Sequence, residues 1–218
     1  MKRNVRTMPP NTEAAAVLRE WVKEEDSLLD ASALDLSRAD LSGADLAMAL
    51  LSQTVFRSTR LVGTDFYRAH LEGAVLDEAD LSSASLVKAE LDDASLRGAT
   101  LDDANLGSSS LYGVDARSAR FRAAKLHGAS LVDVRLEGAD LTAASVRETS
   151  LKAVLDERTV VRGLSGTIFG PVVINHAGRH RELSGPDLGQ WLNSRGAKIR
   201  VLDSRSGDIT SLRKAGRL

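Results

Sequence analysis

The most constraining feature of this sequence is a bulky apolar residue at every fifth position. Steps of five from Leu36 to Leu151 pass through twenty-four positions, and all but Ala116 hold Leu, Phe or Val. From residue 39 onward, the residue two places before each of these centres is Ala, Thr, Ser or Val. This period fits neither the helical repeat of about 3.6 residues nor the two-residue alternation of a single strand. One large and one small inward residue in five instead suits a chain that turns a corner in every pentad.

The pentads resemble the repeat unit of the pentapeptide-repeat family, which reads A(D/N)LXX. Ala39-Asp40-Leu41, Ala79-Asp80-Leu81 and Ala104-Asn105-Leu106 match that unit directly. The resemblance covers residues 34–153, and it implies an all-β solenoid, a right-handed quadrilateral parallel β-helix with four pentads in each coil. Twenty-four pentads would then form about six coils and a rod about 29 Å long at the spacing of neighbouring strands. Each centre would stack on the residue twenty positions later.

The segment before the repeats, residues 1–33, predicts a helix that closes one end of this solenoid. Its amphipathic pattern spans residues 11–30, and Asn11 is the expected N-cap after two prolines. The apolar residues at helical spacing are Val17, Leu18, Trp21, Val22, Leu28 and Leu29. We expect this helix to cover the open backbone edge of the first coil, because bare sheet edges recruit other strands.

The segment after the repeats, residues 154–218, predicts a small α/β cap. Its β-branched runs at 159–162 and 169–175 are strand candidates, and a helix is expected from Ser184 to about Arg195, followed by a strand at 198–203. A basic tail begins at Ser204. An exposed apolar face of the helix, made of Leu188, Trp191 and Leu192, is the expected contact of a homodimer.

Motifs for catalysis or cofactor binding are sparse. The absence of Cys excludes disulfides, thiolate metal sites and a Cys nucleophile. His176 and His180 lie four residues apart, but Gly178 separates them and no third metal ligand is apparent. Carboxylate pairs such as Asp92-Asp93 would lie outside a convex rod, without a pocket to raise a carboxyl pKa. We therefore expect no enzymatic activity, no cofactor and no metal ion.

The overall charge and hydropathy limit the class of partner. The 29 Lys and Arg residues nearly balance 30 Asp and Glu residues, which argues against a generally basic nucleic-acid binder. No apolar run approaches the roughly 18 residues of a membrane span, and the N-terminal residues lack a signal-peptide pattern. We expect a cytoplasmic protein without direct contact to nucleic acid or membrane.

Charge is unevenly distributed over the outer surface of the expected rod. The outward positions of each pentad are the residue before its centre and the two after it. We call face four the outward residues around the column of centres Leu51, Leu71, Leu91, Leu111, Leu131 and Leu151. It carries one basic residue, Lys152, and five acidic ones, which are Glu72, Glu90, Asp92, Asp93 and Asp133. Elsewhere, alternating charges such as Asp40, Arg60 and Asp80 predict ladders of ion pairs, while Tyr67 and Tyr112 are outward aromatic candidates for a partner contact.

The resemblance implies a non-catalytic scaffold that acts through protein–protein contacts. Its best-characterised relatives bind DNA gyrase or topoisomerase IV as acidic, rod-shaped mimics of DNA, and give antibiotic resistance or self-immunity to bacteria. In this chain face four would be the mimic. The amount of charge argues against this mimicry. About 29 Å of B-DNA carries about 17 phosphate charges, whereas the repeats have a net charge of minus five. The alternative is a scaffold for an unrelated protein partner with no topoisomerase role.

Overall fold

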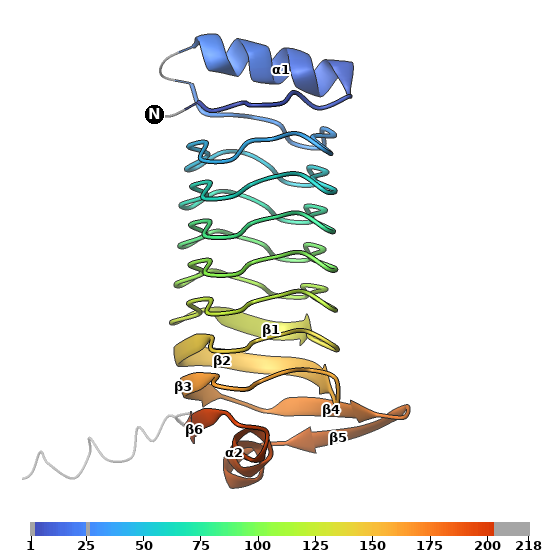
Figure 1. Cartoon of the computed structure of the whole chain (residues 1–218), viewed down its shortest axis with the longest axis vertical. Coiled ribbons are helices and arrows are strands. Elements are labelled where there is room, and N and C mark those ends of the chain that lie inside the picture. The colour runs from blue at the N-terminus through green and yellow to red at the C-terminus, as the bar shows by residue number, and fades with distance from the viewer. Residues whose placement is uncertain (1–2, 25–26, 203–218) are drawn as a thin grey trace, which may run out of the picture.

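The computed structural model describes residues 3–24 and 27–202, and it shows a straight stack of coils with a helix at each end (Figure 1). The basic tail predicted from Ser204 lies outside the described residues. The helices and strands are α1 (Thr12–Lys23), β1 (Ser130–Arg135), β2 (Ser145–Asp156), β3 (Ser165–Phe169), β4 (Val172–His176), β5 (Arg179–Leu183), α2 (Gly185–Ser194) and β6 (Lys198–Leu202).

The coils are held together by parallel backbone pairing between residues twenty positions apart. Asp35 pairs with Val55 in this way, and the same offset recurs along the rod from Asp30 with Leu50 to Asp140 with Val160. The Leu81 amide, for example, donates to the carbonyl of Thr100 at 2.7 Å. Four pentads therefore make one coil, and the backbone polar groups of each coil are satisfied by its neighbours.

Each pentad bends at the two residues that follow its centre. The amide of Ala84 donates to the carbonyl of the centre Leu81 at 3.0 Å, and Ser83 between them has a φ of 58°. A positive φ at only the third residue of a four-residue turn is the type II pattern. That conformation is costly for residues other than Gly, but the Ser83 amide donates to the Asp102 carbonyl of the next coil at 2.8 Å. Pairing between coils thus offsets the strain of the turns.

The core of the rod consists of the predicted centres and the small residues between them. Every centre from Leu36 to Leu151 is at most 5% exposed, and Ala116 is fully buried. Where Thr replaces Ala at the small position, its hydroxyl finds a carbonyl of the preceding coil. The Thr59 hydroxyl donates to the Leu36 carbonyl at 2.9 Å and the Thr64 hydroxyl donates to that of Leu41 at 3.0 Å. The hydroxyls of these two buried threonines are therefore paired inside the stack.

The N-terminal end of the rod is covered by α1 and by the residues before it. The Asn11 side chain accepts the Ala14 amide at 2.9 Å, as predicted for the N-cap, and α1 buries Leu18 and Trp21. Thr7 pairs antiparallel with Asp40 on the edge of the first coil. The prediction of a helix to residue 30 is wrong, because α1 ends at Lys23.

Leu29 and Ala31, which follow α1 in the sequence, already belong to the first coil. The Leu29 carbonyl accepts the Leu50 amide, and the Ala31 amide donates to the Leu50 carbonyl, both at 2.9 Å. Their pairing with the coil replaces the helical turn that their spacing suggested.

At the C-terminal end, parallel pairing continues beyond residue 153, but its offset changes between twenty and nineteen residues, as where Thr149 pairs with Ile168 and Leu155 with Ile174. Val146 of β2 pairs with Gly166 of β3, where φ is 122° and a Cβ would overlap the Val146 carbonyl. The predicted strand at 169–175 is divided between β3 and β4, and the run at 159–162 forms an isolated bridge at Val160. β6 pairs parallel with β3 and so occupies the edge on which another coil would stack.

The hairpin of β4 and β5 and the helix α2 complete this end (Figure 1). The helix and strand expected from Ser184 and at 198–203 correspond to α2 and β6. However, Leu188 and Leu192 are fully buried within the chain, and Trp191 is half-buried with the Arg195 guanidinium 4.3 Å from its ring centroid. The expectation that these residues form an exposed apolar face is therefore wrong, because α2 turns that face onto its own chain.

Candidate binding surface

Face four carries its five acidic side chains on three coils, those of the centres Leu71, Leu91 and Leu131. Glu72 and Asp92 follow the centres Leu71 and Leu91, and they lie one coil apart. Of the five, Glu90, Asp93 and Asp133 are exposed, while Glu72 and Asp92 are half-buried. Because neighbouring coils are separated by about 4.8 Å, the four carboxylates on the coils of Leu71 and Leu91 lie close enough to influence one another, whereas Asp133 lies two coils further along.

The first part of the surface is a cluster around His70. The His70 Nδ1 atom lies 3.3 Å from Glu72 Oε1 and 3.1 Å from Glu90 Oε2, and the Ser52 hydroxyl donates to Glu72 Oε2 at 2.9 Å. Partial burial alone would raise the pKa of Glu72, but hydrogen bonds, among them those from its own backbone and from Ser52, hold that pKa below its ordinary value. The sequence does not single out His70 or Ser52. The available signal was the spacing of twenty that places residues 52 and 72, and 70 and 90, in register.

The second part is built around Asp92 and Asp93. Asp92 Oδ1 accepts the Ser110 hydroxyl at 2.5 Å and the Tyr112 amide at 3.0 Å. The Asp93 side chain occupies the space where a Cβ of residue 113 would lie, so that Gly113 accommodates it. Asp92 thus also holds the backbone of the next coil. Asp93 projects from a turn and Asp133 from the register shift within β1, both at a φ of 58°.

Face four has the largest excess of acidic over basic residues among the faces of the repeats, five against one, and the described basic side chains do not neutralise its carboxylates. Within residues 3–24 and 27–202, no Lys or Arg forms an ion pair with any of the five. On another face, Arg97 and Arg117 lie 2.7 and 2.6 Å from Asp115. Burial alone would raise the pKa of Asp115, but the two guanidinium groups hold it well below its ordinary range.

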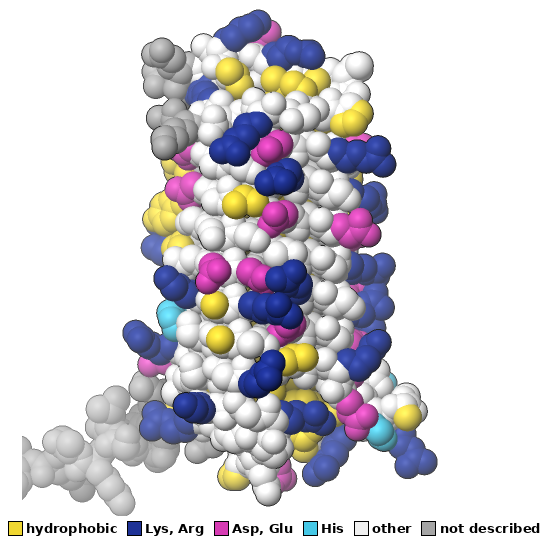
Figure 2. All heavy atoms as spheres, in the orientation of Figure 1, with side chains coloured by type: hydrophobic (Ala, Val, Ile, Leu, Met, Phe, Trp, Pro, Cys, Tyr) yellow, Lys and Arg dark blue, Asp and Glu magenta, His cyan; other side chains and the backbone are white. Residues whose placement is uncertain are grey.

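The predicted ion-pair ladder forms only in part. Arg60 lies 3.6 Å from Asp40, whereas Asp80 accepts hydrogen bonds from Ser82 instead. Figure 2 shows one side of the rod, on which basic and acidic side chains lie close together. Other faces also carry acidic residues without an ion pair among the described residues, for example Asp65 and Glu148. Face four is distinguished by its five acidic residues against one basic residue.

The two predicted aromatic contacts do not lie together. Tyr67 follows the centre Phe66 on a different face, is half-buried, and has the Arg68 guanidinium 5.4 Å from its ring centroid. Tyr112 lies on face four, and 49% of it is exposed beside Asp92. Only Tyr112 adjoins the acidic residues.

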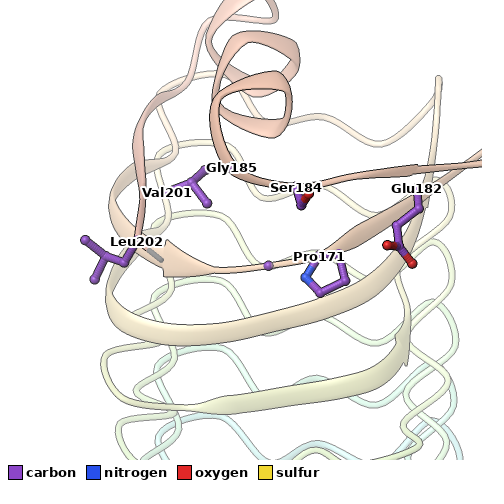
Figure 3. Close-up of a pocket in the computed structure, with 7 residues that line it drawn as sticks. Pro171, Glu182, Ser184, Gly185, Val201 and Leu202 are labelled. Carbon is purple, nitrogen blue, oxygen red and sulfur yellow. The ribbon is translucent and has the colours of Figure 1, made fainter. Parts of the chain in front are cut away.

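A hollow at the C-terminal end differs from the acidic surface of face four, because a single ionisable side chain among the described residues lines it. It measures about 380 Å³ and lies between α2, β6 and the junction of β3 and β4 (Figure 3). Glu182 is the one ionisable side chain among its lining residues, which are Gly170, Pro171, Glu182, Ser184, Gly185, Val201 and Leu202. This lining offers a single carboxyl rather than the acid–base pair that proton transfer uses.

His176 and His180 do not lie on a helix. They belong to β4 and β5, on either side of the hairpin turn at Ala177-Gly178. His176 Nδ1 lies 2.9 Å from Glu157 Oε1.

Comparison with protein families finds eight copies of the pentapeptide repeats between residues 35 and 154. The matched ranges are 35–73, 64–103, 74–113, 89–128 and 119–154. The chain belongs to the pentapeptide-repeat family. Proteins of this family are generally non-catalytic scaffolds that act in protein interactions.

Solved structures with the same repeats resemble parts of this chain. A pentapeptide repeat protein from the thylakoid lumen of Arabidopsis thaliana is 34% identical over 42% of this chain and 64% of its own length, with a TM-score of 0.42. HetL, involved in heterocyst differentiation regulation in a Nostoc cyanobacterium, is 22% identical over 85% of this chain and 90% of its own, with a TM-score of 0.32. QnrB1, a plasmid-mediated fluoroquinolone resistance protein, is 17% identical over 86% and 91%, with a TM-score of 0.40.

Two further comparisons are negative. A search of curated proteins finds no match to the sequence. Among the residues that the structure describes, no helix combines the length and apolar character needed to cross a bilayer.

Proposed function

We propose that this protein is a binding scaffold whose face four contacts a positively charged surface of a protein partner. The observation that carries the proposal is that, within the described residues, none of the five acidic side chains of face four is paired with Lys or Arg. Unpaired charges on one side of a rod steer an oppositely charged partner and fix its register. Tyr112 adds an exposed aromatic ring beside these charges.

The partner that we propose to test first is a bacterial type II topoisomerase, DNA gyrase or topoisomerase IV. Family resemblance supports this choice, since acidic rods of this kind imitate DNA. The role would be protection against a topoisomerase poison, in antibiotic resistance or self-immunity, within the cytoplasm. The acidic charge of face four would occupy part of the DNA-binding surface of the enzyme, and DNA itself would not be bound.

The proposal also includes the handedness, cross-section and number of coils of the rod. We infer right-handed winding, four flat sides and about six coils in residues 34–153, between end segments at 1–33 and 154–218. Flat sides matter here, because they place residues twenty apart in straight columns. A straight acidic column is what a surface adapted to a DNA duplex would accept.

A DNA supercoiling assay tests this function. Purified protein is titrated into DNA gyrase with and without a quinolone, beside the variant Glu90→Lys/Asp93→Lys/Asp133→Lys. Asp92 is left unchanged because it also holds the Tyr112 amide. Lys is compatible with the backbone at positions 93 and 133, since Lys88 occupies the same place in its pentad with a φ of 59°.

A matched control separates the face from overall charge. The variant Glu78→Lys/Asp103→Lys/Glu148→Lys changes the net charge equally, and its three residues are exposed, have positive φ and lie on the other faces. We expect the wild type and the control to inhibit or protect gyrase, and the face-four variant to lose the effect. Equal behaviour of the two variants would contradict a role for face four.

The alternative partner is a protein unrelated to the topoisomerases. One observation favours it, namely that Met48 and Leu50 are 45% and 43% exposed beside His70 and Glu90. A surface that only imitates phosphates has no need of exposed apolar groups, whereas protein interfaces combine both kinds. Folded protein without any effect on gyrase or topoisomerase IV would leave this alternative.

A further inference from the structure

Three potential metal-ligand atoms converge on face four. They are His70 Nδ1 and one carboxylate oxygen each from Glu72 and Glu90, and all three lie within 4.8 Å of one another. His70 and Glu90 lie in the same column on neighbouring coils. Glu72 lies on the coil of His70, directly after the centre Leu71. The solenoid register therefore places the three side chains together.

Hydrogen bonding alone does not account well for this arrangement. The His70 Nδ1 atom faces Glu72 Oε1 at 3.3 Å and Glu90 Oε2 at 3.1 Å. A ring nitrogen carries either one hydrogen or one lone pair, so it makes one good hydrogen bond rather than two. Two carboxylates directed at the same point also repel each other. A cation placed between the three atoms would interact favourably with all of them.

The two separations from the His70 Nδ1 atom agree with the coordination sphere of a small transition metal ion. Bonds of about 2.0–2.1 Å in a tetrahedral site place neighbouring ligand atoms about 3.3 Å apart. The observed separations of Nδ1 from the two oxygens, 3.3 and 3.1 Å, lie close to this value. An imidazole nitrogen with two carboxylate oxygens is a ligand set suited to Zn²⁺ and its neighbours, whereas Mg²⁺ and Ca²⁺ prefer oxygen alone.

We propose that His70, Glu72 and Glu90 form a binding site for a divalent transition metal ion, of which Zn²⁺ is the ion to test. The Ser52 hydroxyl, which donates to Glu72 Oε2 at 2.9 Å, would orient that ligand from outside the coordination sphere. The remaining coordination positions face outward and are open to water or to an atom of a partner. The site does not depend on the identity of the partner.

The surroundings favour a transition metal over an ion held by charge alone. Arg68 and Lys88 line the same hollow as His70 and Glu90, a depression of about 530 Å³. Their positive charges oppose any cation. An ion that gains a strong bond to the imidazole nitrogen overcomes this opposition better than an alkaline-earth ion does.

Isothermal titration calorimetry on the full chain tests the site. The protein carries no polyhistidine tag, is stripped of metal with a chelator and is then titrated with ZnCl₂. We expect one equivalent to bind saturably, while MgCl₂ under the same conditions gives no saturable binding. Co²⁺ offers a second readout, because its visible absorption reports imidazole and carboxylate coordination directly.

Two variants and one control locate the binding. His70→Gln and Glu90→Gln are each expected to weaken Zn²⁺ binding by at least about tenfold and to abolish the Co²⁺ spectrum. The control is His176→Gln, because His176 Nδ1 also faces a carboxylate, that of Glu157 at 2.9 Å, but no second one among the residues that the structure describes. It should leave both readouts unchanged, and circular dichroism checks that all three proteins fold.

The proposal is overturned if folded wild-type protein binds no Zn²⁺, or if His70→Gln binds it as tightly as the wild type does. Loss of binding in His176→Gln alone would overturn it as well, since the site would then lie on the hairpin. None of these outcomes depends on gyrase, so failure of the metal site and failure of the topoisomerase role are distinguishable.

Discussion

At the scale of single residues, the position before each centre explains the Asp or Asn of the repeat. The Asp140 carboxylate accepts the backbone amide of Thr142 at 2.9 Å, and Asn105 accepts that of Gly107 at 3.2 Å. A short side chain with an acceptor at this place closes the turn that follows. On face four the position holds Leu50, His70, Glu90, Ser110, Ser130 and Ser150. Acidic groups on this face are therefore less occupied by turn formation than those on other faces.

Turn formation by carboxylates predicts that the rod loses stability in acid. Burial alone would raise the pKa of Asp140, but hydrogen bonds from Thr142 and Arg122 lower it, and the pKa of Asp156 is lowered in the same way by Gly138 and Arg158. A pKa lower in the folded than in the unfolded protein adds stability above the unfolded pKa of about 4, and this stability disappears as the pH falls through the folded pKa. We expect the free energy of unfolding in urea to decrease steadily from pH 5 to pH 2.

The variant Asp140→Asn assigns part of this effect. Asn keeps an acceptor for the Thr142 amide but does not ionise, so the variant should lose less stability than the wild type over the same pH range. Asp103→Asn is the control, because Asp103 is exposed and accepts no hydrogen bond from any side chain or amide that the structure describes. An identical pH dependence in wild type and Asp140→Asn would contradict the assignment.

At the scale of one coil, each centre points inward and the residue before it points outward. Substitutions at the two positions test these directions. Leu106 is fully buried, whereas Asn105, one residue earlier, points outward at a position where Asp is common. Leu106→Asp would place a carboxylate in the core and is expected to cost at least about 4 kcal/mol. Since small domains are stable by about 5–15 kcal/mol, most or all of the folded state should be lost.

The matched variant Asn105→Asp introduces the same side chain one residue away. It should leave the urea midpoint nearly unchanged, because its carboxylate still accepts the Gly107 amide. Circular dichroism during urea unfolding measures both variants. A wild-type midpoint for Leu106→Asp would contradict the inward direction of the centres.

The coils and helices show which parts of the fold sequence patterns predict and which parts they do not. The five-residue period predicts the buried centres because each centre packs on identical positions of its neighbours. Leu28 and Leu29 continue the helical spacing of α1 only by coincidence, and backbone pairing of Leu29 with Leu50 determines their structure instead. Leu188 and Leu192 define an apolar face of α2 correctly, but the sequence does not say that the same chain covers it.

The candidate surface was predictable in its charge but not in its contacts. Register alone places Glu72, Glu90 and Asp92 on one face. The approach of His70 to both Glu72 and Glu90 depends on side-chain conformations that a column of positions does not specify. Likewise, Asp92 accepts the amide of Tyr112 from another coil because Ser110 leaves that amide without an Asp in its own pentad.

At the scale of the whole molecule, the rod is a one-dimensional stack with two different ends. Each coil contacts only its neighbours, so the backbone edges at the ends must be covered. Thr7 and α1 cover the first edge, and β6 with α2 covers the last (Figure 1). The sides remain free, and face four, with five acidic residues against one basic residue, is the side on which a basic partner surface gains most.

The measurement that tests the role of face four most directly is competition with DNA. A fluorescent DNA duplex is bound to DNA gyrase, and its anisotropy is followed as the protein is added. We predict that the wild type and the control Glu78→Lys/Asp103→Lys/Glu148→Lys displace the duplex, and that Glu90→Lys/Asp93→Lys/Asp133→Lys needs at least about tenfold more protein. No displacement by folded wild-type protein, or equal displacement by both variants, would contradict a DNA-like role for this face.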